Sequence, residues 1–129
     1  MASPAFAAFA TRLLDMADDE QDPTRVANAL AKLHHVVFFK LLPPGEMPRV
    51  VAITRRYLSG TYPPIVWLAA VELAAATGDE ELRAMVAGIA SGALHPTFVE
   101  GADLGLWVRS AAQRALLKRD DVSRASGLS

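Results

Sequence analysis

The stretch that decides the fold is an apolar run near the middle of the chain, Tyr62-Pro63-Pro64-Ile65-Val66-Trp67-Leu68-Ala69-Ala70-Val71-Glu72-Leu73. Its two prolines stand where a helix can begin, because the first helical turn does not need the N–H that proline lacks. From there to Ala76 the sequence contains no further helix breaker and a single charge, Glu72. A helix that is apolar nearly all round is buried nearly all round. The run therefore predicts a central, buried helix.

The pattern of this helix occurs three times along the chain. Val66 is followed by small residues three and four positions later and by Leu73 after seven positions. The three copies are Val26, Ala29, Leu30, Leu33; Val66, Ala69, Ala70, Leu73; and Val108, Ala111, Ala112, Ala115, at steps of 40 and 42 residues. Such a period is typical of helical-repeat proteins, in which each unit is a helical hairpin. The sequence therefore predicts three stacked hairpins whose small residues allow close helix packing.

Start and stop signals place six helices in all. The expected starts are Ser3-Pro4, Asp22-Pro23, Met47-Pro48, Pro63-Pro64, Asp79 and Asp103, since Ser or Asp caps a helix and proline suits its first position. The expected ends are the acidic stretch Asp18-Asp19-Glu20, interpreted as a solvated turn, then Pro43-Pro44-Gly45, Ser59-Gly60, Thr77-Gly78, Ser91-Gly92 and Arg119. No segment alternates as a β-strand does, so the fold class is all-α.

These helices group into units of residues 3–42, 46–77 and 79–119 within one domain, residues 3–119. The last ten residues, 120–129, lack an apolar period and are expected to form a flexible tail. The first helix has an expected apolar face, formed by Phe6, Phe9, Ala10, Leu13 and Ala17.

Two stretches resemble the second helix of HEAT repeats, in the HEAT/armadillo-like superfamily. They are the central run and Leu106-Trp107-Val108-Arg109-Ser110-Ala111-Ala112-Gln113-Arg114-Ala115-Leu116. The HEAT pattern has a turn, a Val-Arg pair and then two small residues. Val108-Arg109 keeps that pair, Arg25-Val26 permutes it after Asp22-Pro23, and the central unit has Trp67 in place of the Arg. The resemblance implies a short right-handed α-solenoid that acts as a binding scaffold, with the second helices lining its concave face.

Composition excludes several classes of protein. The chain has 129 residues and no cysteine, which excludes a disulfide scaffold, cysteine zinc sites and thiol catalysis. Ala and Leu supply 24 and 16 residues, an excess that favours helix. The net charge of −1 hides a banding, with about −4 over residues 1–22, +5 over 23–60, −4 over 61–102 and +2 over 103–129. This balance argues against a global basic field for nucleic acid.

Catalytic motifs are not found in the sequence. Ser59-Gly60-Thr61 lacks the lysine and the preceding glycine of a phosphate-binding loop. His34 and His35 are adjacent, so on a helix they point about 100° apart and cannot easily share a metal. We expect His34 to be partly buried and His35 exposed. The expectation is a protein that is not an enzyme, with no metal site and no cofactor.

Equivalent positions of the three second helices carry alternating charges. Six residues after each reference valine stand Lys32, Glu72 and Arg114. The favoured interpretation is a ladder of surface charges that helps to set the register of the units. The alternative interpretation is a column of a recognition surface. Glu72, in so apolar a helix, needs either a partner or an exposed position.

Aromatic residues give a second indication of a binding surface. Phe38 and Phe39 are consecutive, so both cannot follow the apolar stripe of their helix. Phe39 falls on the side of His35, and an exposed aromatic beside a basic residue is typical of a binding hot spot. Packing is the favoured interpretation for Phe38 and Phe39, and likewise for Trp67 and Trp107.

The favoured function is a non-catalytic interaction module. Its second-helix face would bind a protein or peptide, and the residues expected there are Lys32, His35, Phe39, Glu72, Arg109 and Arg114. Self-association as a homodimer is compatible with this, because terminal repeat units expose apolar edges.

Two alternatives stay open. One is binding of a nucleic-acid backbone through Arg109, Arg114, Lys118 and Arg119, which the pI of about 6.3 and the acidic segments disfavour. The other is a lyase-type relative of HEAT proteins, which requires an apolar pocket that reaches Glu72 or a histidine. A membrane partner is not expected, because no run approaches the ~20 apolar residues that span a bilayer. The N-terminus lacks the basic start of a signal peptide, so the expected location is the cytoplasm.

Overall fold

Six helices follow one another along the chain in the computed structural model, which describes residues 4–19, 22–97 and 107–117. They are α1 (Pro4–Asp18), α2 (Pro23–Phe38), α3 (Met47–Leu58), α4 (Pro64–Thr77), α5 (Glu80–Ser91) and a helix at residues 107–117. The described residues contain no strand, only an isolated parallel bridge between Thr61 and Thr97. The prediction of an all-α protein with six helices is confirmed. The outer parts of the last predicted helix and the tail at 120–129 lie outside the described residues.

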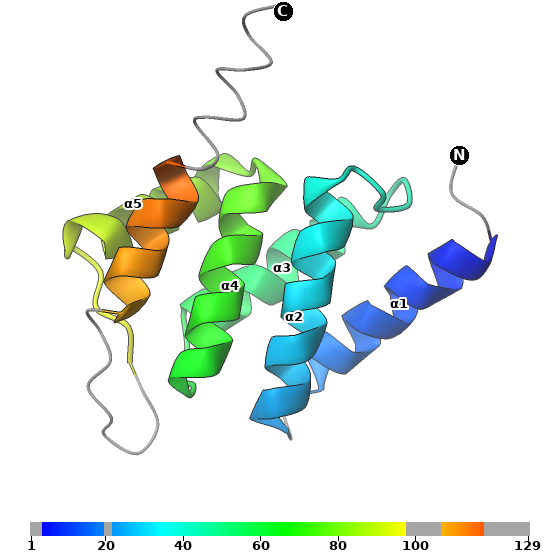
Figure 1. Ribbon diagram of the computed structural model, residues 1–129, viewed down its shortest axis with the longest axis horizontal. Helices are drawn as coiled ribbons and strands as arrows, with labels where there is room; N and C mark the ends of the chain where they lie inside the picture. The colour runs from blue at the N-terminus through cyan, green and yellow to red at the C-terminus, as the bar shows by residue number, and fades with distance from the viewer. Residues whose placement is uncertain (1–3, 20–21, 98–106, 118–129) are drawn as a thin grey trace, which may run out of the picture.

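The second helices of the three predicted hairpins lie side by side. In Figure 1, α2, α4 and the helix at residues 107–117 form one layer towards the viewer, with α3 and α5 behind it and α1 at one end. The most extensive packing joins α2 to α4; α1 packs on α2 and α3, and α4 also packs on α3 and α5. We call α2, α4 and the helix at residues 107–117 the second-helix layer. None of the described helices combines the length and the apolar character needed to cross a membrane.

The central helix α4 is buried as its composition predicts. Its buried residues are Val66, Trp67, Ala70, Val71, Leu73, Ala74 and Ala75. Gly78 ends the helix in the left-handed conformation, at φ 75°, which favours glycine because it has no Cβ to clash. Asp79 then caps α5, since its carboxylate accepts a hydrogen bond of 3.0 Å from the Leu82 N–H. Both predicted signals are confirmed.

The helix α2 begins as predicted and ends in a strained residue. At its start, the Asp22 carboxylate accepts hydrogen bonds from the Thr24 and Arg25 N–H groups, at 3.1 and 3.3 Å. At its end, the Leu41 N–H donates to the Val36 carbonyl at 2.8 Å, and Lys40 has φ 58°. This is a Schellman-type ending, a position where glycine is the usual residue. A lysine at this position is unfavourable, because its Cβ is in steric conflict with the backbone in the left-handed conformation.

We expect Lys40→Gly to raise the free energy of unfolding by about 0.5 to 1 kcal/mol, because it relieves the left-handed conformation at a smaller entropic cost. Urea denaturation followed by far-UV circular dichroism measures the change. Lys40→Ala is the matched control, since it removes the charge but keeps the Cβ. An equal gain from both substitutions would mean that the charge of Lys40, not its backbone, is unfavourable.

Ion pairs join the first helices of the units to one another. The Arg49 guanidinium of α3 lies 2.7 Å from the Asp15 carboxylate of α1, and Arg56 lies 2.6 Å from Asp18. Arg55 lies 2.9 Å from Glu81 of α5. The hydrogen bond to Asp15 raises the pKa of Arg49 above its ordinary value. Asp18 ends α1 and is exposed, as expected for the solvated turn, and its carboxylate also pairs with Arg56 of α3.

The end of α1 is capped by side chains of α3 rather than by its own sequence. The buried Tyr57 hydroxyl donates a hydrogen bond to the Ala17 carbonyl. An Arg56 Nη2 lies 3.3 Å from the Asp18 carbonyl, and the Arg56 guanidinium stands 5.1 Å above the Tyr57 ring. Carbonyls of the last helical turn have no partner within their helix. The cap comes from residues about 40 positions away in the sequence.

The buried face of α1 differs from the predicted one at Phe9. The core residues of α1 are Ala10, Leu13, Leu14 and Ala17, whereas Phe9 is 39% exposed. Phe9 lies about a quarter of a turn from the centre of that face. Among the described helices, α1 packs on α2 and α3, and the core face of α1 is centred away from Phe9. The inclusion of Phe9 in the apolar face is thus wrong, and the side chain of Phe6 lies outside the described residues.

Candidate partner-binding groove

A groove of about 240 Å³ opens over α4, between α2 and the helix at residues 107–117. All three helices of the second-helix layer contribute to it. Its lining residues are His34 and Phe38 from α2, Glu72, Ala75 and Ala76 from α4, and Ala111, Arg114 and Ala115 from the helix at residues 107–117. We call this site the groove. It has an alanine floor, an aromatic wall and two charged side chains.

The groove exists because the third repeat lacks a leucine. The last position of the repeated pattern is Leu33 in α2 and Leu73 in α4, and both side chains are fully buried. The equivalent residue of the third copy is Ala115, which is half-buried and lines the groove. A methyl group leaves unfilled the space that the leucine side chain occupies in the other units. Space therefore remains open between the helix at residues 107–117 and α4, and this space is part of the groove.

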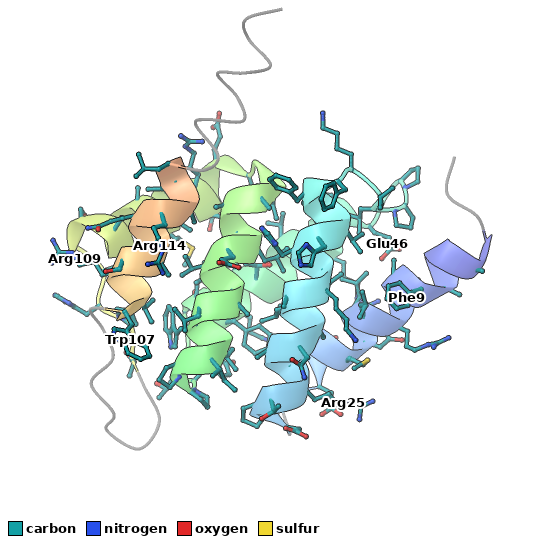
Figure 2. All side chains as sticks on the ribbon, in the orientation of Figure 1. Phe9, Arg25, Glu46, Trp107, Arg109 and Arg114 are labelled. Atoms are coloured by element: carbon teal, nitrogen blue, oxygen red, sulfur yellow. The ribbon has the colours of Figure 1, made fainter. Side chains whose placement is uncertain are left out.

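Glu72 and Arg114 bring opposite charges to the groove. Glu72 projects from α4, and Figure 2 shows Arg114 on the side of its helix that is turned towards α4. Both side chains are exposed. Within the described part of the chain, neither forms a hydrogen bond or an ion pair. Their hydrogen-bonding groups are therefore available to a ligand, and Glu72 meets the expectation that its charge needs an exposed position.

The aromatic wall is formed by two half-buried rings of α2. The centroids of the His34 and Phe38 rings are 5.9 Å apart. His34 is half-buried and His35 is exposed, as predicted. Residues four apart share one side of a helix, so His34 and Phe38 both face the groove. The favoured packing interpretation holds only in part for Phe38, because its half-buried ring also lines the groove.

The other predicted residues of α2 lie outside the groove. Lys32 and His35 are exposed on the outward side of the helix, and the His35 and Phe39 rings stack at 6.4 Å with an interplanar angle of 15°. Phe39 is 62% exposed. The packing interpretation of Phe39 is wrong, because the helix ends at Phe38 and the Phe39 ring extends past its last turn.

Arg109 has a different role from Arg114. Its Nε donates a hydrogen bond of 3.2 Å to the Ala90 carbonyl near the end of α5, and the Gln113 amide donates to the same carbonyl at 3.0 Å. In Figure 2 the Arg109 side chain points away from α4. Residues five apart differ by about 140° around a helix, so Arg109 and Arg114 cannot form one basic strip. Lys118 and Arg119 of the nucleic-acid alternative lie outside the described residues.

The predicted ladder of charges is not formed by ion pairs. Among the described residues, Lys32, Glu72 and Arg114 form no ion pair with one another. The ionic contacts between units join Arg49 and Arg56 to α1 instead, on the first helices. The favoured interpretation, in which Lys32, Glu72 and Arg114 form a ladder that sets the register of the units, is therefore wrong. In the part of the chain that the structure describes, the ion pairs between units lie on the first helices, not on the second helices.

The two tryptophans behave differently. Trp67 is 3% exposed, and its Nε1 donates a hydrogen bond of 2.9 Å to the Thr97 carbonyl, so its predicted packing role is confirmed. Trp107 is 65% exposed, and the packing interpretation is wrong for it. Trp107 is the first described residue of its helix and lies at the lower end of that helix in Figure 2.

Sequence reasoning missed Ala115 as a residue of the site and predicted for His34 only a partly buried position. The replacement of leucine by alanine at the last position of the third copy was the available signal. Among residues 4–19, 22–97 and 107–117, no group of three or more His, Cys, Asp or Glu side chains could hold a metal ion. No family model, no curated protein and no solved structure matches this chain.

Proposed function

We propose that residues 3–119 form one short right-handed α-solenoid of about three HEAT-like hairpins. Three observations support this architecture. The second helices repeat at steps of 40 and 42 residues, and they lie in one layer in Figure 1. Ion pairs between α1, α3 and α5 join the first helices in the same order.

The function that this architecture supports best is binding of a protein or peptide through the second-helix layer, without catalysis and without a cofactor. The observation that carries the proposal is the groove. A concave site with an apolar floor and a few polar groups at its edge is typical of recognition sites. Its volume of about 240 Å³ suits one large apolar side chain of a partner, as hot-spot pockets do. The cytoplasmic location expected from the sequence belongs to this proposal.

We expect filling of the groove to abolish peptide binding. Peptides selected from a displayed random library against the unmodified chain should lose at least about tenfold in affinity towards Ala115→Phe, because the aromatic ring occupies the site of the anchor side chain. Ala76→Phe should have the same effect from the opposite helix. Isothermal titration calorimetry with the synthetic peptides measures both losses.

Ala87→Phe is the matched control, since Ala87 is exposed on α5. It makes the same chemical change away from the groove and should leave affinity within about twofold. Circular dichroism verifies that all variants are folded, and light scattering shows whether any variant changes the oligomeric state. Selected peptides that bind the filled and unfilled variants equally would overturn the proposal.

The lyase-type alternative requires a pocket that reaches Glu72 or a histidine, and the groove is lined by both Glu72 and His34. This is the specific observation that favours a second candidate. Glu72 is exposed, however, and a general base acts best where closure of the site excludes water. Binding therefore accounts better for the open geometry of the groove.

A further inference from the structure

The charges of the second-helix layer are asymmetric. Neither α2 nor the helix at residues 107–117 contains an acidic residue, and Glu72 is the only charged residue of α4. Lys32 lies on the outward side of α2, Arg114 lines the groove, and Lys40 follows the end of α2. By contrast, the three arginines of α3 are paired with acidic residues of α1 and α5. Arg114 thus lies on one side of the groove, and Lys40 stands two residues after Phe38, which lines the other side.

Glu72, the acidic residue of the groove, lies at a fixed position next to the alanines of the groove floor. Glu72 precedes Ala75 and Ala76 by three and four residues on α4. Residues at this spacing lie on one side of a helix, one turn apart. A segment lying over α4 would therefore meet an apolar hollow and, about one turn away, a carboxylate. Its two flanks would meet Arg114 on one side and the end of α2, which Lys40 follows, on the other.

We infer that the groove binds an acidic amphipathic helix that presents one large apolar side chain and, one turn away, one basic side chain. This inference rests on the proposed function and specifies its partner. The apolar side chain occupies the hollow between Phe38 and Ala115. The basic side chain pairs with Glu72, and acidic residues on the flanks pair with Arg114 and Lys40. Charge complementarity of this kind increases specificity and the rate of association.

The same arrangement disfavours nucleic acid as the occupant. A phosphate backbone is negative throughout, so a strand lying across the groove would bring phosphate against the Glu72 carboxylate. A peptide can place one basic residue at that point and acidic residues elsewhere. Glu72 therefore selects between two polyanionic partners that the flanking basic residues would both attract.

The test uses a synthetic helical peptide rich in Glu and Ala, with one central Leu and with Lys four residues before and four residues after it. The two lysines allow the peptide to bind in either direction. Two matched peptides replace the Leu by Ala or both Lys by Glu, and a short DNA duplex is the fourth probe. Fluorescence anisotropy at one fixed low ionic strength measures all affinities.

We expect the parent peptide to bind, and each matched peptide to bind at least about tenfold more weakly. Arg114→Glu should weaken binding of the parent peptide by about tenfold or more, because an acidic flank then meets a like charge. Arg109→Glu is the control, since it makes the same charge change on the same helix outside the groove, and it should alter affinity less than about threefold. Glu72→Lys should reverse the preference, so that the peptide without Lys binds better than the parent.

Three results would overturn the inference. They are tighter binding of DNA than of the parent peptide, equal effects of Arg114→Glu and Arg109→Glu, and an unchanged preference in Glu72→Lys. If peptides selected from a library still depend on Ala115 while these charge changes have no effect, the inference fails and the proposed function stands. If groove filling has no effect either, both fail.

Discussion

Leu73→Ala is expected to lower the free energy of unfolding by about 2 to 5 kcal/mol. Leu73 is fully buried in the middle of α4, the helix that packs on α2, α3 and α5. Its truncation removes buried methyl groups and leaves a cavity that rigid neighbouring helices can close only in part. Since domains of this size are stable by only about 5 to 15 kcal/mol, a large part of the total would be lost.

Urea denaturation followed by far-UV circular dichroism measures this loss, with an unchanged m-value showing that unfolding remains two-state. Leu117→Ala is the matched control, because the same chemical change occurs at a side chain that is 64% exposed. It should change the free energy of unfolding by no more than about 0.5 kcal/mol. Similar losses for the two variants would mean that α4 is not the centre of the core.

The hydroxyl group and the ring of Tyr57 are expected to make separate contributions to the free energy of unfolding. Tyr57→Phe removes the hydroxyl that donates to the Ala17 carbonyl and should cost about 1 to 2 kcal/mol, because a buried carbonyl at the end of α1 loses its partner. Tyr57→Ala removes a fully buried ring as well and should cost about 3 to 5 kcal/mol. The difference between the two variants reports the packing of the ring.

The same urea titrations measure both changes, and Phe39→Ala provides the comparison for an exposed aromatic ring. Its effect should stay within about 0.5 kcal/mol. If Tyr57→Phe proves neutral, water or another donor replaces the hydroxyl, and α1 does not depend on α3 for its cap. Amide hydrogen exchange in the last turn of α1 distinguishes these cases, since loss of the cap increases fraying there.

Local signals in the sequence predicted the helices well. Asp22 and Asp79 cap α2 and α5 as expected, and Gly78 and Gly92 end α4 and α5 in the left-handed conformation. These features depend on hydrogen bonds between residues two to four apart, which are visible in any stretch of sequence. The repeat also identified the helices that form the second-helix layer, because its valines and small residues mark their buried faces.

The site was predicted only in part. Glu72 and Arg114 were chosen from the repeat, and both line the groove. Phe39 and Trp107 were expected in the core, yet both are exposed. Phe39 is exposed because α2 ends at Phe38, so that its ring extends past the last turn of the helix. A periodic pattern describes which side of a helix is apolar, but it does not say where the neighbouring helix stops.

The sequence by itself determined that this protein is all-α, where helices α1 to α5 begin, and which helix is central. All of these follow from short-range hydrogen bonding and from the period of apolar residues. Only the tertiary structure decided that Asp18 pairs with Arg56, that Arg109 turns towards α5, and that a groove opens beside Ala115. These features join residues about 20 to 80 positions apart. Their formation depends on how far neighbouring helices overlap and on which side chains fill the space between them, and neither quantity is carried by any one segment of the chain.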